Sequence, residues 1–292
     1  MAGRFAPSPT SDLHLGNLRT ALLAWLMAKS TGRDFLARIE DLDQARSAAA
    51  PAMADKQLAD LAALGLTWDG PVIRQSERFD LYRDHASRLD TYECFCTRAE
   101  IAAAAQAPHG DHRPYPGTCA RLTKAEKSAR KGRLPALRVR ANSARATIED
   151  AHAGSVTGIV DDFVLVRGDG TPAYNLAVVV DDGLQGVDQV VRGADLLSSS
   201  PRQAWLATQL GLPVPAYAHV GLAVNERGDR LAKRDGAVTF GELTAKGLDV
   251  LAILTDSLGW PRFDSAEALL RAATRTLLDA PKVWEPWVVS PY

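Results

Sequence analysis

The sequence predicts an α/β fold in which helices pack against a parallel sheet. Strand-like and helix-like segments alternate over residues 1–75. This order is typical of parallel sheets, because each strand needs a crossover before the next can run the same way. The chain has 292 residues, of which 46% are hydrophobic and 24% charged. This length leaves room for about two domains and at least one sizeable core.

A short strand and a long helix open the chain. Residues Gly3 to Ala6 are strand-like, and Pro7 and Pro9 end the strand because proline cannot donate to a sheet. Apolar residues then recur with the spacing of one helix face, and Gly32 ends this amphipathic helix. The apolar stripe consists of Leu18, Ala21, Leu22, Trp25 and Leu26.

A second strand and helix repeat the order. Residues Phe35 to Ile39 are strand-like, and Ser47 and Pro51 suit the start of a helix. Gly65 suits the position just after its end, where a left-handed backbone is common. The expected apolar stripe consists of Met53, Leu58, Leu61, Ala62 and Leu64.

The alternation breaks after about residue 88. Residues 89–150 contain all three cysteines, a loop rich in proline and glycine, and a basic segment, so we expect an insertion there. Strand-like runs at 163–166, 176–180 and 190–191 indicate that the same sheet then resumes.

A helix at 202–210 and a run at 218–223 come next. A polar turn at 225–229 follows, and the remainder is mostly helical in pattern. This organisation predicts four segments, the first and third of which share one sheet. They are 1–88, 89–150, 151–212 and 213–292.

Charge and hydropathy limit the functional classes. The net charge is −1, so a nucleic-acid partner would have to be attracted by a local patch. A candidate patch is the basic segment 121–145, whose only acidic residue is Glu126; a solvated helix face is the alternative. Its cations are Arg121, Lys124, Lys127, Arg130, Lys131, Arg133, Arg138, Arg140 and Arg145.

Neither a membrane span nor a secretory signal is expected. No apolar run approaches the roughly 20 residues of a membrane helix. The start, Met1 to Phe5, lacks the basic and apolar stretches of a signal peptide. We therefore expect a cytoplasmic protein, in which cysteines clustered between Cys94 and Cys119 are more often metal ligands or free thiols than disulfides.

The segment from Ala6 to Asn17 links the first strand to the first helix. A helix N-terminus offers unpaired N–H groups and the positive end of the helix dipole, which suit a phosphate. His14 could donate to a phosphoryl group as negative charge builds, and Gly16 would let a flat ring or ribose approach the backbone. Taken alone, such residues are more often a helix cap and a turn.

Two strand ends carry charged residues. Arg38 and Glu40 lie at the carboxyl end of the second strand, where open α/β sheets bind ligands. Alternation puts both on one face, so Glu40 could pair with an ammonium group; a salt-bridged strand end is the alternative. Arg192 also ends an apolar run, and arginine suits the bidentate capture of a carboxylate.

A basic string follows the polar turn, from Arg230 to Arg234. A mobile loop of this kind could close over a triphosphate and neutralise charge as pyrophosphate leaves. By itself, a string of basic residues discriminates poorly between such a loop and an ordinary surface.

In combination, these segments resemble the class I glutamyl-tRNA synthetase superfamily. The first and last are similar to its two signatures, usually written HIGH and KMSKS. The strings that carry the resemblance, in order over roughly residues 3–234, are RFAPSPT, LHLGN, RIEDLD, AYNLAVVVDD and VVRGADLL. The resemblance implies a Rossmann-like parallel sheet as the catalytic domain, a zinc-containing insertion, and a small helical C-terminal region that carries the KMSKS-like loop.

The resemblance also implies roles for matched residues. The glutamate pocket would be lined by Arg4, Phe5, Ala6, Pro7, Ser8, Glu40, Tyr174 and Arg192. ATP would be bound, together with Mg²⁺, by His14, Gly16, Asn17 and Lys233. Arg4 and Arg192 would bind the carboxylates of the substrate, Glu40 its α-amino group, and Tyr174 would close the site. His14, Gly16 and Lys233 would be the catalytic residues.

The KMSKS-like loop departs from the usual pattern. It has Arg230 in place of the leading lysine and Ala232 in place of the serine, but it keeps Lys233. We therefore expect activity with a different loop equilibrium.

Only residues 234–292 follow Lys233. Full-length members continue into a long helical anticodon-binding region, which we do not expect to fit here. The chain therefore resembles the short glutamyl-Q tRNA(Asp) synthetase branch, which attaches glutamate to the cyclopentenediol of queuosine at the wobble position of tRNA(Asp). The resemblance implies ATP, L-glutamate and queuosine-containing tRNA(Asp) as substrates of a monomer.

The cysteine cluster is similar to the zinc site of this family. Zinc favours four tetrahedral ligands in structural sites, and thiolates are good ligands. His109 and His112 stay open as alternatives for the fourth ligand, and three metal-free thiols are the alternative to a metal site. The ligands implied for one structural zinc ion are Cys94, Cys96, Tyr115 and Cys119.

Two other functions stay open from the sequence. One is a short glutamyl-tRNA synthetase that charges the 3′ end of tRNA(Glu). The other is a non-catalytic RNA-binding paralogue, which the altered KMSKS-like loop would fit. A dinucleotide-binding oxidoreductase is not expected, since no G-x-G-x-x-G string follows the first strand.

Overall fold

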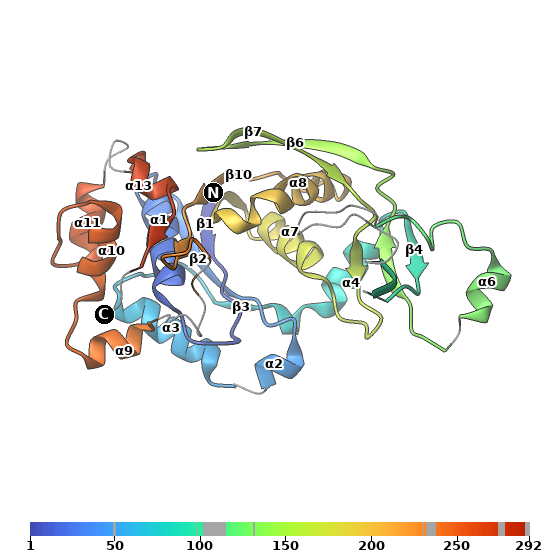
Figure 1. Ribbon diagram of the computed structural model, residues 1–292, viewed down its shortest axis with the longest axis horizontal. Coiled ribbons are helices and arrows are strands. Elements are labelled where there is room, and N and C mark those ends of the chain that lie inside the picture. The colour runs from blue at the N-terminus through green and yellow to red at the C-terminus, as the bar shows by residue number, and fades with distance from the viewer. Residues whose placement is uncertain are drawn as a thin grey trace.

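A seven-stranded sheet organises the molecule (Figure 1). The computed structural model describes residues 1–48, 51–97, 99–101, 115–130, 132–229, 231, 238–273 and 278–289. The strands of the sheet are β1 (Ala2–Phe5), β2 (Asp34–Ile39), β3 (Ile73–Arg74), β6 (Ala144–Asp150), β7 (Gly154–Val160), β9 (Val187–Gly193) and β10 (Ala216–Val220). Their order across the sheet is β3-β2-β1-β9-β10-β6-β7.

The sheet is parallel from β3 to β6, as predicted, and β7 pairs antiparallel with β6. Strand β1 pairs with β2 on one side and with β9 on the other. The order of the strands along the chain therefore reverses at β1. Ligands of open α/β sheets bind at the carboxyl ends of the strands beside such a reversal.

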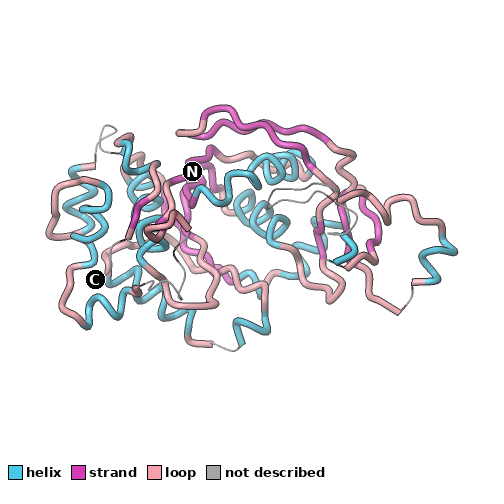
Figure 2. The backbone as a smooth tube through the Cα atoms, in the orientation of Figure 1, coloured by secondary structure: helices cyan, strands magenta, loops and turns pink. Residues whose placement is uncertain are grey.

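Helices cover both faces of the sheet (Figure 2). Helix α1 (Leu15–Lys29) packs on one face, and α7 (Tyr174–Leu184) and α8 (Ser200–Gln209) pack on the other. Alternate residues of β2 show the two faces directly, because Phe35 joins the core around α1 whereas Leu36 packs against the core of the opposite face.

Helix α1 is buried on nearly all sides, so the prediction of an amphipathic helix was wrong in this respect. Leu23, Ala24 and Met27 lie outside the expected stripe and are buried as well. Leu254 and Leu269, from the C-terminal helices α10 (Val250–Leu258) and α11 (Ala266–Ala272), belong to the same core and cover the outer side of α1. The helix is therefore enclosed between the sheet and the C-terminal region.

Residues 176–180 were predicted as a strand, and this prediction was wrong. They lie in the middle of α7, and every one of them is buried. A short, wholly apolar run fits a buried helix as well as a buried strand, because neither leaves a polar face in the pattern. The three consecutive valines, Val178 to Val180, favour a strand locally, but tertiary packing overrides that preference.

The segment around the cysteines has a small sheet of its own. Strands β4 (Thr91–Cys94), β5 (Ala136–Val139) and β8 (Val164–Val166) pair antiparallel, and α6 (Lys124–Ala129) precedes β5. The prediction that the run at 163–166 belongs to the main sheet was therefore wrong. Strand β6 ends at the predicted boundary near residue 150. It pairs along its length with β7, which lies in the next predicted segment. The division into four segments stays a prediction.

Short elements complete the chain. They are α2 (Gln44–Ala48), α3 (Met53–Ala63), α4 (Phe79–Ser87), β11 (Ala223–Val224), α9 (Phe240–Ala245), α13 (Pro281–Trp284) and β12 (Trp287–Val288). Gly65 follows α3 with a φ of +85°, which confirms its predicted place after the helix end. Strands β11 and β12 form a parallel pair that ties the C-terminal segment to the end of β10.

Arg19 anchors α1 to the C-terminal segment. Its side chain is buried and donates hydrogen bonds to the backbone oxygens of Gly221, at 2.7 Å, and of Lys282. Burial lowers the pKa of Arg19 to about 10. Only glycine fits at position 221, since a Cβ there would lie 1.8 Å from the carbonyl oxygen of Glu285. These contacts hold the N-terminus of α1 in a fixed place beside the sheet.

Candidate active site at the carboxyl edge of the sheet

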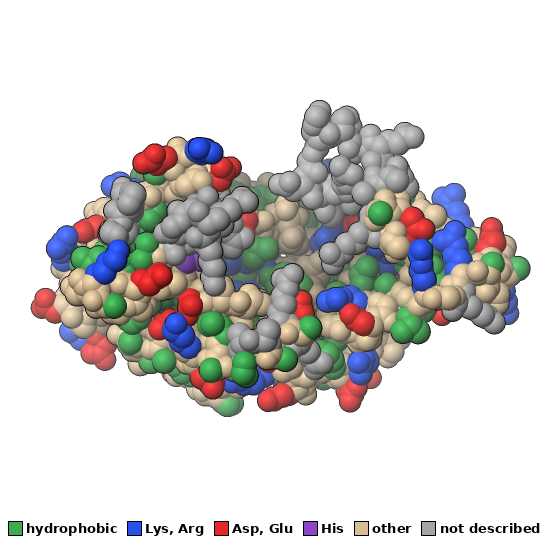
Figure 3. Space-filling model, turned by 60° about the horizontal axis from the view of Figure 1, so that its bottom comes forward, with side chains coloured by type: hydrophobic (Ala, Val, Ile, Leu, Met, Phe, Trp, Pro, Cys, Tyr) green, Lys and Arg blue, Asp and Glu red, His purple; other side chains and the backbone are tan. Residues whose placement is uncertain are grey.

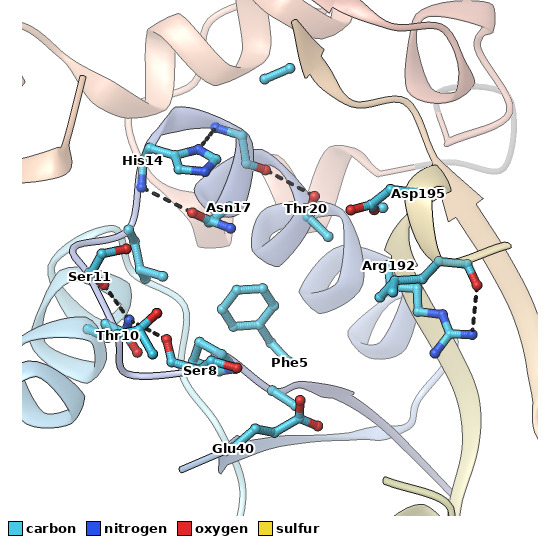
Figure 4. Close-up of a pocket in the computed structure, with 18 of the residues that line it drawn as sticks. Phe5, Ser8, Thr10, Ser11, His14, Asn17, Thr20, Glu40, Arg192 and Asp195 are labelled. Carbon is cyan, nitrogen blue, oxygen red and sulfur yellow. Dashed lines mark hydrogen bonds between the residues drawn. The ribbon is translucent and has the colours of Figure 1, made fainter. Parts of the chain in front are cut away.

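A cavity of about 430 Å³ lies where the strand order reverses. Its walls come from the end of β1 and the loop after it, the start of α1, the ends of β2 and β9, and the first residue of α7. In Figure 4, His14 and Asn17 lie on one side of the cavity and Glu40 and Arg192 on the other, with Phe5 between them. The cavity thus has a helix N-terminus on one side and charged strand ends on the other.

Arg4 extends from β1 and is fixed by a buried carboxylate. Its Nε and Nη2 atoms each donate to Asp182 of α7, at 3.2 Å. Arg38 donates to the same carboxylate, with 2.8 Å between Nη1 and Oδ1. Burial acts to raise the pKa of Asp182, but the two guanidinium groups outweigh burial and lower it. Arg4 therefore lines the cavity in a fixed orientation, with its charge balanced from behind.

Glu40 follows β2 and lines the same cavity. Its carboxylate lies 3.4 Å from Nη2 of Arg38, whose side chain is completely buried. Burial raises the pKa of Glu40, and the attraction of Arg38 and Arg4 only partly offsets that effect. An ammonium group in the cavity would stabilise the ionised form, so Glu40 is suited to bind one.

Tyr174 and Arg192 line the cavity from the same face of the sheet as Arg4, the face that α7 covers. Tyr174 is the first residue of α7, and burial, followed by the nearby Glu40, raises the pKa of its hydroxyl, which keeps it a hydrogen-bond donor. Arg192 lies on β9 and is 5% exposed. It donates through Nε to His219 at 3.0 Å and through Nη1 to Gln203 at 2.8 Å.

The start of α1 forms the other side of the cavity. His14 caps the helix, because its Nδ1 accepts from the N–H of Gly16 at 3.1 Å, while Asn17 accepts from the N–H of His14 at 3.2 Å. With Nδ1 accepting, the proton of the neutral ring is on Nε2, so Nε2 is a hydrogen-bond donor. Gly16 is required by packing as well, since a Cβ there would lie 2.8 Å from the Cβ of Ala223.

The structure therefore gathers the predicted pocket residues around one cavity. They are Arg4, Phe5, Ala6, Pro7, Ser8, His14, Gly16, Asn17, Glu40, Tyr174 and Arg192. Lys233 lies outside the residues that the structure describes. The roles given to all of these residues stay predictions, although their placement suits an amino acid with two carboxylates beside a nucleotide.

Sequence reasoning missed the residues that hold the pocket from behind. Asp182 stands in a matched string but had no assigned role, and His219 and Gln203 were not singled out. The two consecutive aspartates, Asp181 and Asp182, directly after an apolar run are the signal that could have found Asp182, because a charged residue that is buried needs a partner. His219 and Gln203 carry no such signal in the sequence.

The three cysteine sulfurs form a second site, in the small sheet region. The Sγ atoms of Cys94, Cys96 and Cys119 all lie within 4.8 Å of one another, and they could hold a metal ion. A tetrahedral zinc ion with Zn–S bonds of about 2.3 Å would need about 3.8 Å between sulfurs. The hydroxyl of Tyr115 lies 3.4 Å from Cys94 and 3.6 Å from Cys96, so it is close enough to be a fourth ligand. His109 and His112 lie outside the described residues.

The thiols of this site differ in acidity. Burial raises the pKa of Cys96 to about 11. Burial acts in the same direction on Cys119, but hydrogen bonds from the N–H of Phe95 and from neighbouring side chains outweigh it and lower the pKa of Cys119. Arg138 stacks on the ring of Tyr115, with 3.8 Å from the guanidinium carbon to the ring centre. These surroundings favour the thiolate of Cys119, whereas the thiol of Cys96 would have to lose its proton as a metal ion binds.

The basic segment 121–145 divides between structural and exposed side chains. Arg138 is buried beneath the cysteine site. Lys124 and Lys127 lie on α6, and Lys127 pairs with Glu93 at 3.5 Å. Lys and Arg side chains gather at the end of the molecule that carries α6, on the face that Figure 3 shows.

The described helices include none with the length and apolar surface needed to cross a bilayer.

Comparison with known proteins gives concordant results. The family model for class I tRNA synthetases (E and Q), catalytic domain, matches residues 1–272. The glutamyl-Q tRNA(Asp) synthetase of Nocardia farcinica is 57% identical, over 99% of this chain and 93% of that protein. The enzyme of the same name from Cutibacterium acnes is 58% identical, over 94% of this chain and 81% of that protein.

Solved structures agree with these relatives. The glutamate-tRNA synthetase of Elizabethkingia anophelis superposes with a TM-score of 0.80 at 26% identity, over 99% of this chain and 68% of that one. A glutamate tRNA ligase from Elizabethkingia meningosepticum, solved with its amino acid, gives a TM-score of 0.79 at 25% identity, over 98% and 67%. The fold of this chain is therefore the catalytic fold of these proteins.

Proposed function

Since the chain belongs to the class I glutamyl- and glutaminyl-tRNA synthetase family, and within it to the glutamyl-Q tRNA(Asp) synthetases, we propose that it activates L-glutamate with ATP and transfers it to queuosine of tRNA(Asp). The chain is accordingly a ligase that forms an adenylate. We further propose that it acts as a monomer in the cytoplasm, where its substrates are found.

The observation that supports this proposal most strongly is the convergence of charge in the cavity. Arg4 and Arg192 lie on adjacent strands, and Glu40 follows the strand on the far side of β1. Two guanidinium groups and one carboxylate match the two carboxylates and one ammonium of glutamate. A substrate that lacks the side-chain carboxylate would leave a buried arginine without a partner, so such a pocket discriminates strongly.

The first step would join glutamate to the nucleotide. An oxygen of the α-carboxylate attacks the α-phosphorus of ATP, the bond to the bridging oxygen breaks, and pyrophosphate leaves with its electron pair. Mg²⁺ bound with ATP would shield the negative charges of the phosphates. His14 at the start of α1 would donate to a phosphoryl oxygen, and Lys233 would neutralise charge on the leaving group.

The second step would transfer the glutamyl group. A hydroxyl of the queuosine cyclopentenediol attacks the activated carbonyl, and AMP leaves. Neither step needs a side-chain nucleophile, so catalysis would come from positioning and from charge stabilisation. The residues of the cavity are accordingly proposed as binding groups, and no general base is assigned.

A charging assay tests the proposal. With ATP and labelled glutamate, we expect alkali-labile glutamate on tRNA(Asp) that contains queuosine, and none on tRNA(Asp) lacking the modification or on tRNA(Glu). Charging of tRNA(Glu) instead would identify a short glutamyl-tRNA synthetase. Absence of glutamate-dependent exchange of pyrophosphate into ATP, with and without tRNA, would identify a non-catalytic paralogue.

We propose that the cysteine site holds one structural zinc ion through Cys94, Cys96, Cys119 and Tyr115. The three thiols and the hydroxyl lie at distances that suit a tetrahedral ion. The ion would cross-link β4 to the segment before α6, and it would therefore stabilise the insertion rather than take part in the reaction.

Metal analysis of protein purified without a metal-affinity tag is expected to find about one zinc per chain. Tyr115→Phe keeps the ring under Arg138 but removes the hydroxyl, so zinc affinity should fall by roughly 10- to 100-fold. Tyr92→Phe is the matched control, because Tyr92 stacks on Arg140 and its hydroxyl bonds Asp162. Zinc affinity that is unchanged in Tyr115→Phe would show that the fourth ligand lies elsewhere, and metal-free protein would contradict the site.

A further inference from the structure

The two arginines of the cavity differ in how their charge is balanced. Arg4 forms a bidentate pair with the carboxylate of Asp182. Arg192 is equally buried, but the groups that its hydrogen bonds reach are Gln203, Ser200, the carbonyl of Leu196 and the ring of His219. The first three are neutral, so the charge of the groups that Arg192 contacts directly depends on the protonation state of His219.

The hydrogen bonds of His219 define that state. Its Nε2 lies 3.0 Å from Nε of Arg192, which is always a donor, so Nε2 must accept. Its Nδ1 lies 2.7 Å from Oδ2 of Asp150, a carboxylate that can only accept, so Nδ1 must donate. The ring is therefore neutral, with its proton on Nδ1. Imidazolium, or the other neutral form, would point an N–H at the guanidinium.

Asp150 is itself held rigidly at the end of β6. Its Oδ2 also accepts from the N–H of His219 at 3.1 Å, and its Oδ1 accepts from the N–H groups of His152 and Ala153, at 3.0 and 2.9 Å. These bonds lower the pKa of Asp150 despite its burial, so it stays ionised. The carboxylate lies beyond the imidazole ring, on the side away from Arg192.

We propose that Asp150 and His219 are positioning residues that fix the Arg192 guanidinium and, by keeping its hydrogen-bond partner neutral, reserve its charge for a carboxylate of the substrate. This inference rests on the proposed function, in which Arg192 binds glutamate. The buried charge of Arg192 is costly without a counter-ion. The substrate carboxylate supplies one, and this raises selectivity for an acidic amino acid over its amide.

The surroundings of His219 keep it neutral over the working range. Burial and then the positive charge of Arg192 lower its pKa, and Asp150 acts in the opposite direction but does not overcome them. Arg4, on β1, adds a smaller effect of the same sign as that of Arg192. Tyr217 stacks on the imidazole with 5.9 Å between ring centres, and Ser200 lies 3.2 Å from Nε2.

Two substitutions of His219 test the roles of its two ring nitrogens separately. His219→Gln places an amide oxygen near the position of Nε2, so it can still accept from Arg192. His219→Asn places an amide N–H₂ near the position of Nδ1, so it can still donate to Asp150 but leaves Arg192 without its acceptor. Asp150→Asn presents a donor to His219 and forces the ring into the form that repels Arg192, as loss of the orienting carboxylate does in other histidine relays.

The measurement is glutamate-dependent exchange of pyrophosphate into ATP, with tRNA present. We expect His219→Asn and Asp150→Asn to raise the KM for glutamate by about 10- to 100-fold. The kcat should change by less than about threefold, since the relay acts on binding. His219→Gln should recover most of the lost affinity. His85→Asn, at a buried histidine whose Nδ1 contacts only the backbone of its own helix, is the control for stability.

A merely structural role would make the Asn and Gln variants equal in KM, and that result would overturn the proposal. The tautomer gives a readout that does not depend on activity. Nitrogen NMR of the imidazole, with the signal assigned through His219→Gln, should show a protonated Nδ1 and an unprotonated Nε2 from pH 6 to 8. A proton on Nε2 would contradict the relay even in an active enzyme, whereas inactivity of the wild type with the expected tautomer would contradict only the proposed function.

Discussion

Asp182→Ala is expected to destabilise the fold by about 3–5 kcal/mol and to abolish glutamate binding in whatever protein still folds. The Asp182 carboxylate pairs with both Arg4 and Arg38 in the interior. Its removal leaves two buried guanidinium groups with less negative charge around them, and such groups cost far more than a lost surface pair. Arg4 would also lose the bidentate contact that orients it in the cavity.

Urea unfolding of the variant and titration with glutamate measure the two effects. Asp188→Ala is the matched control, because Asp188 pairs with Arg33 at 3.0 Å but with side chains that are 35% and 21% exposed. That substitution should change stability by about 1 kcal/mol or less. Equal losses in the two variants would show that the Asp182 pairs contribute no more than a surface bridge.

The pH dependence of stability gives an independent check on Asp182. Its pKa in the folded protein lies below the ordinary value, because Arg4 and Arg38 outweigh burial. The stabilisation is therefore present above the unfolded pKa of about 3.9 and is lost as the pH falls through the lower, folded value. Wild type and Asp182→Ala should accordingly differ most near neutral pH, and the difference should shrink only in acid.

The sequence was sufficient to predict the parallel sheet from local signals, whereas the cavity residues followed from the resemblance of the matched strings to a known family. The strand that ends before Pro7, the helix that ends before Gly65 and the strand whose end carries Arg192 all lie where these signals predict them. The matched strings then place strand ends and a helix start on one edge of the sheet, where parallel strands bring them together.

What could not be predicted depends on packing between distant segments. Val178 to Val180 form part of a helix because α7 is enclosed, and no local pattern reports enclosure. The same applies to β8, which pairs with β5 rather than with the main sheet. The partner of Arg192 lies on β10, and the carboxylate that orients this partner lies on β6, so a single sequence gives no reason to connect them.

Glu40→Gln is expected to reduce kcat/KM for glutamate by roughly 100-fold or more while leaving the fold as stable as before or more stable. The carboxylate of Glu40 would pair with the substrate ammonium, and an amide cannot replace that charge. Its pKa is raised because burial outweighs the attraction of Arg38 and Arg4. Ionised Glu40 therefore costs stability at neutral pH, and this cost serves binding.

The pKa of Glu40 is raised whereas that of Asp182 is lowered, so the stabilities of the two variants should depend on pH in opposite ways. Because its pKa is raised, Glu40 does not lower the free energy of unfolding below the unfolded pKa of about 4.3. The loss of stability grows as the pH rises from there to the folded pKa. The stability of Glu40→Gln relative to wild type should thus increase with pH over that window, and KM for glutamate should rise in acid for wild type alone. Asp182→Asn removes the same charge but should lower stability at neutral pH. If both substitutions destabilise the protein alike, Glu40 is a structural ion-pair partner of Arg38, and the ammonium site must be sought elsewhere in the cavity.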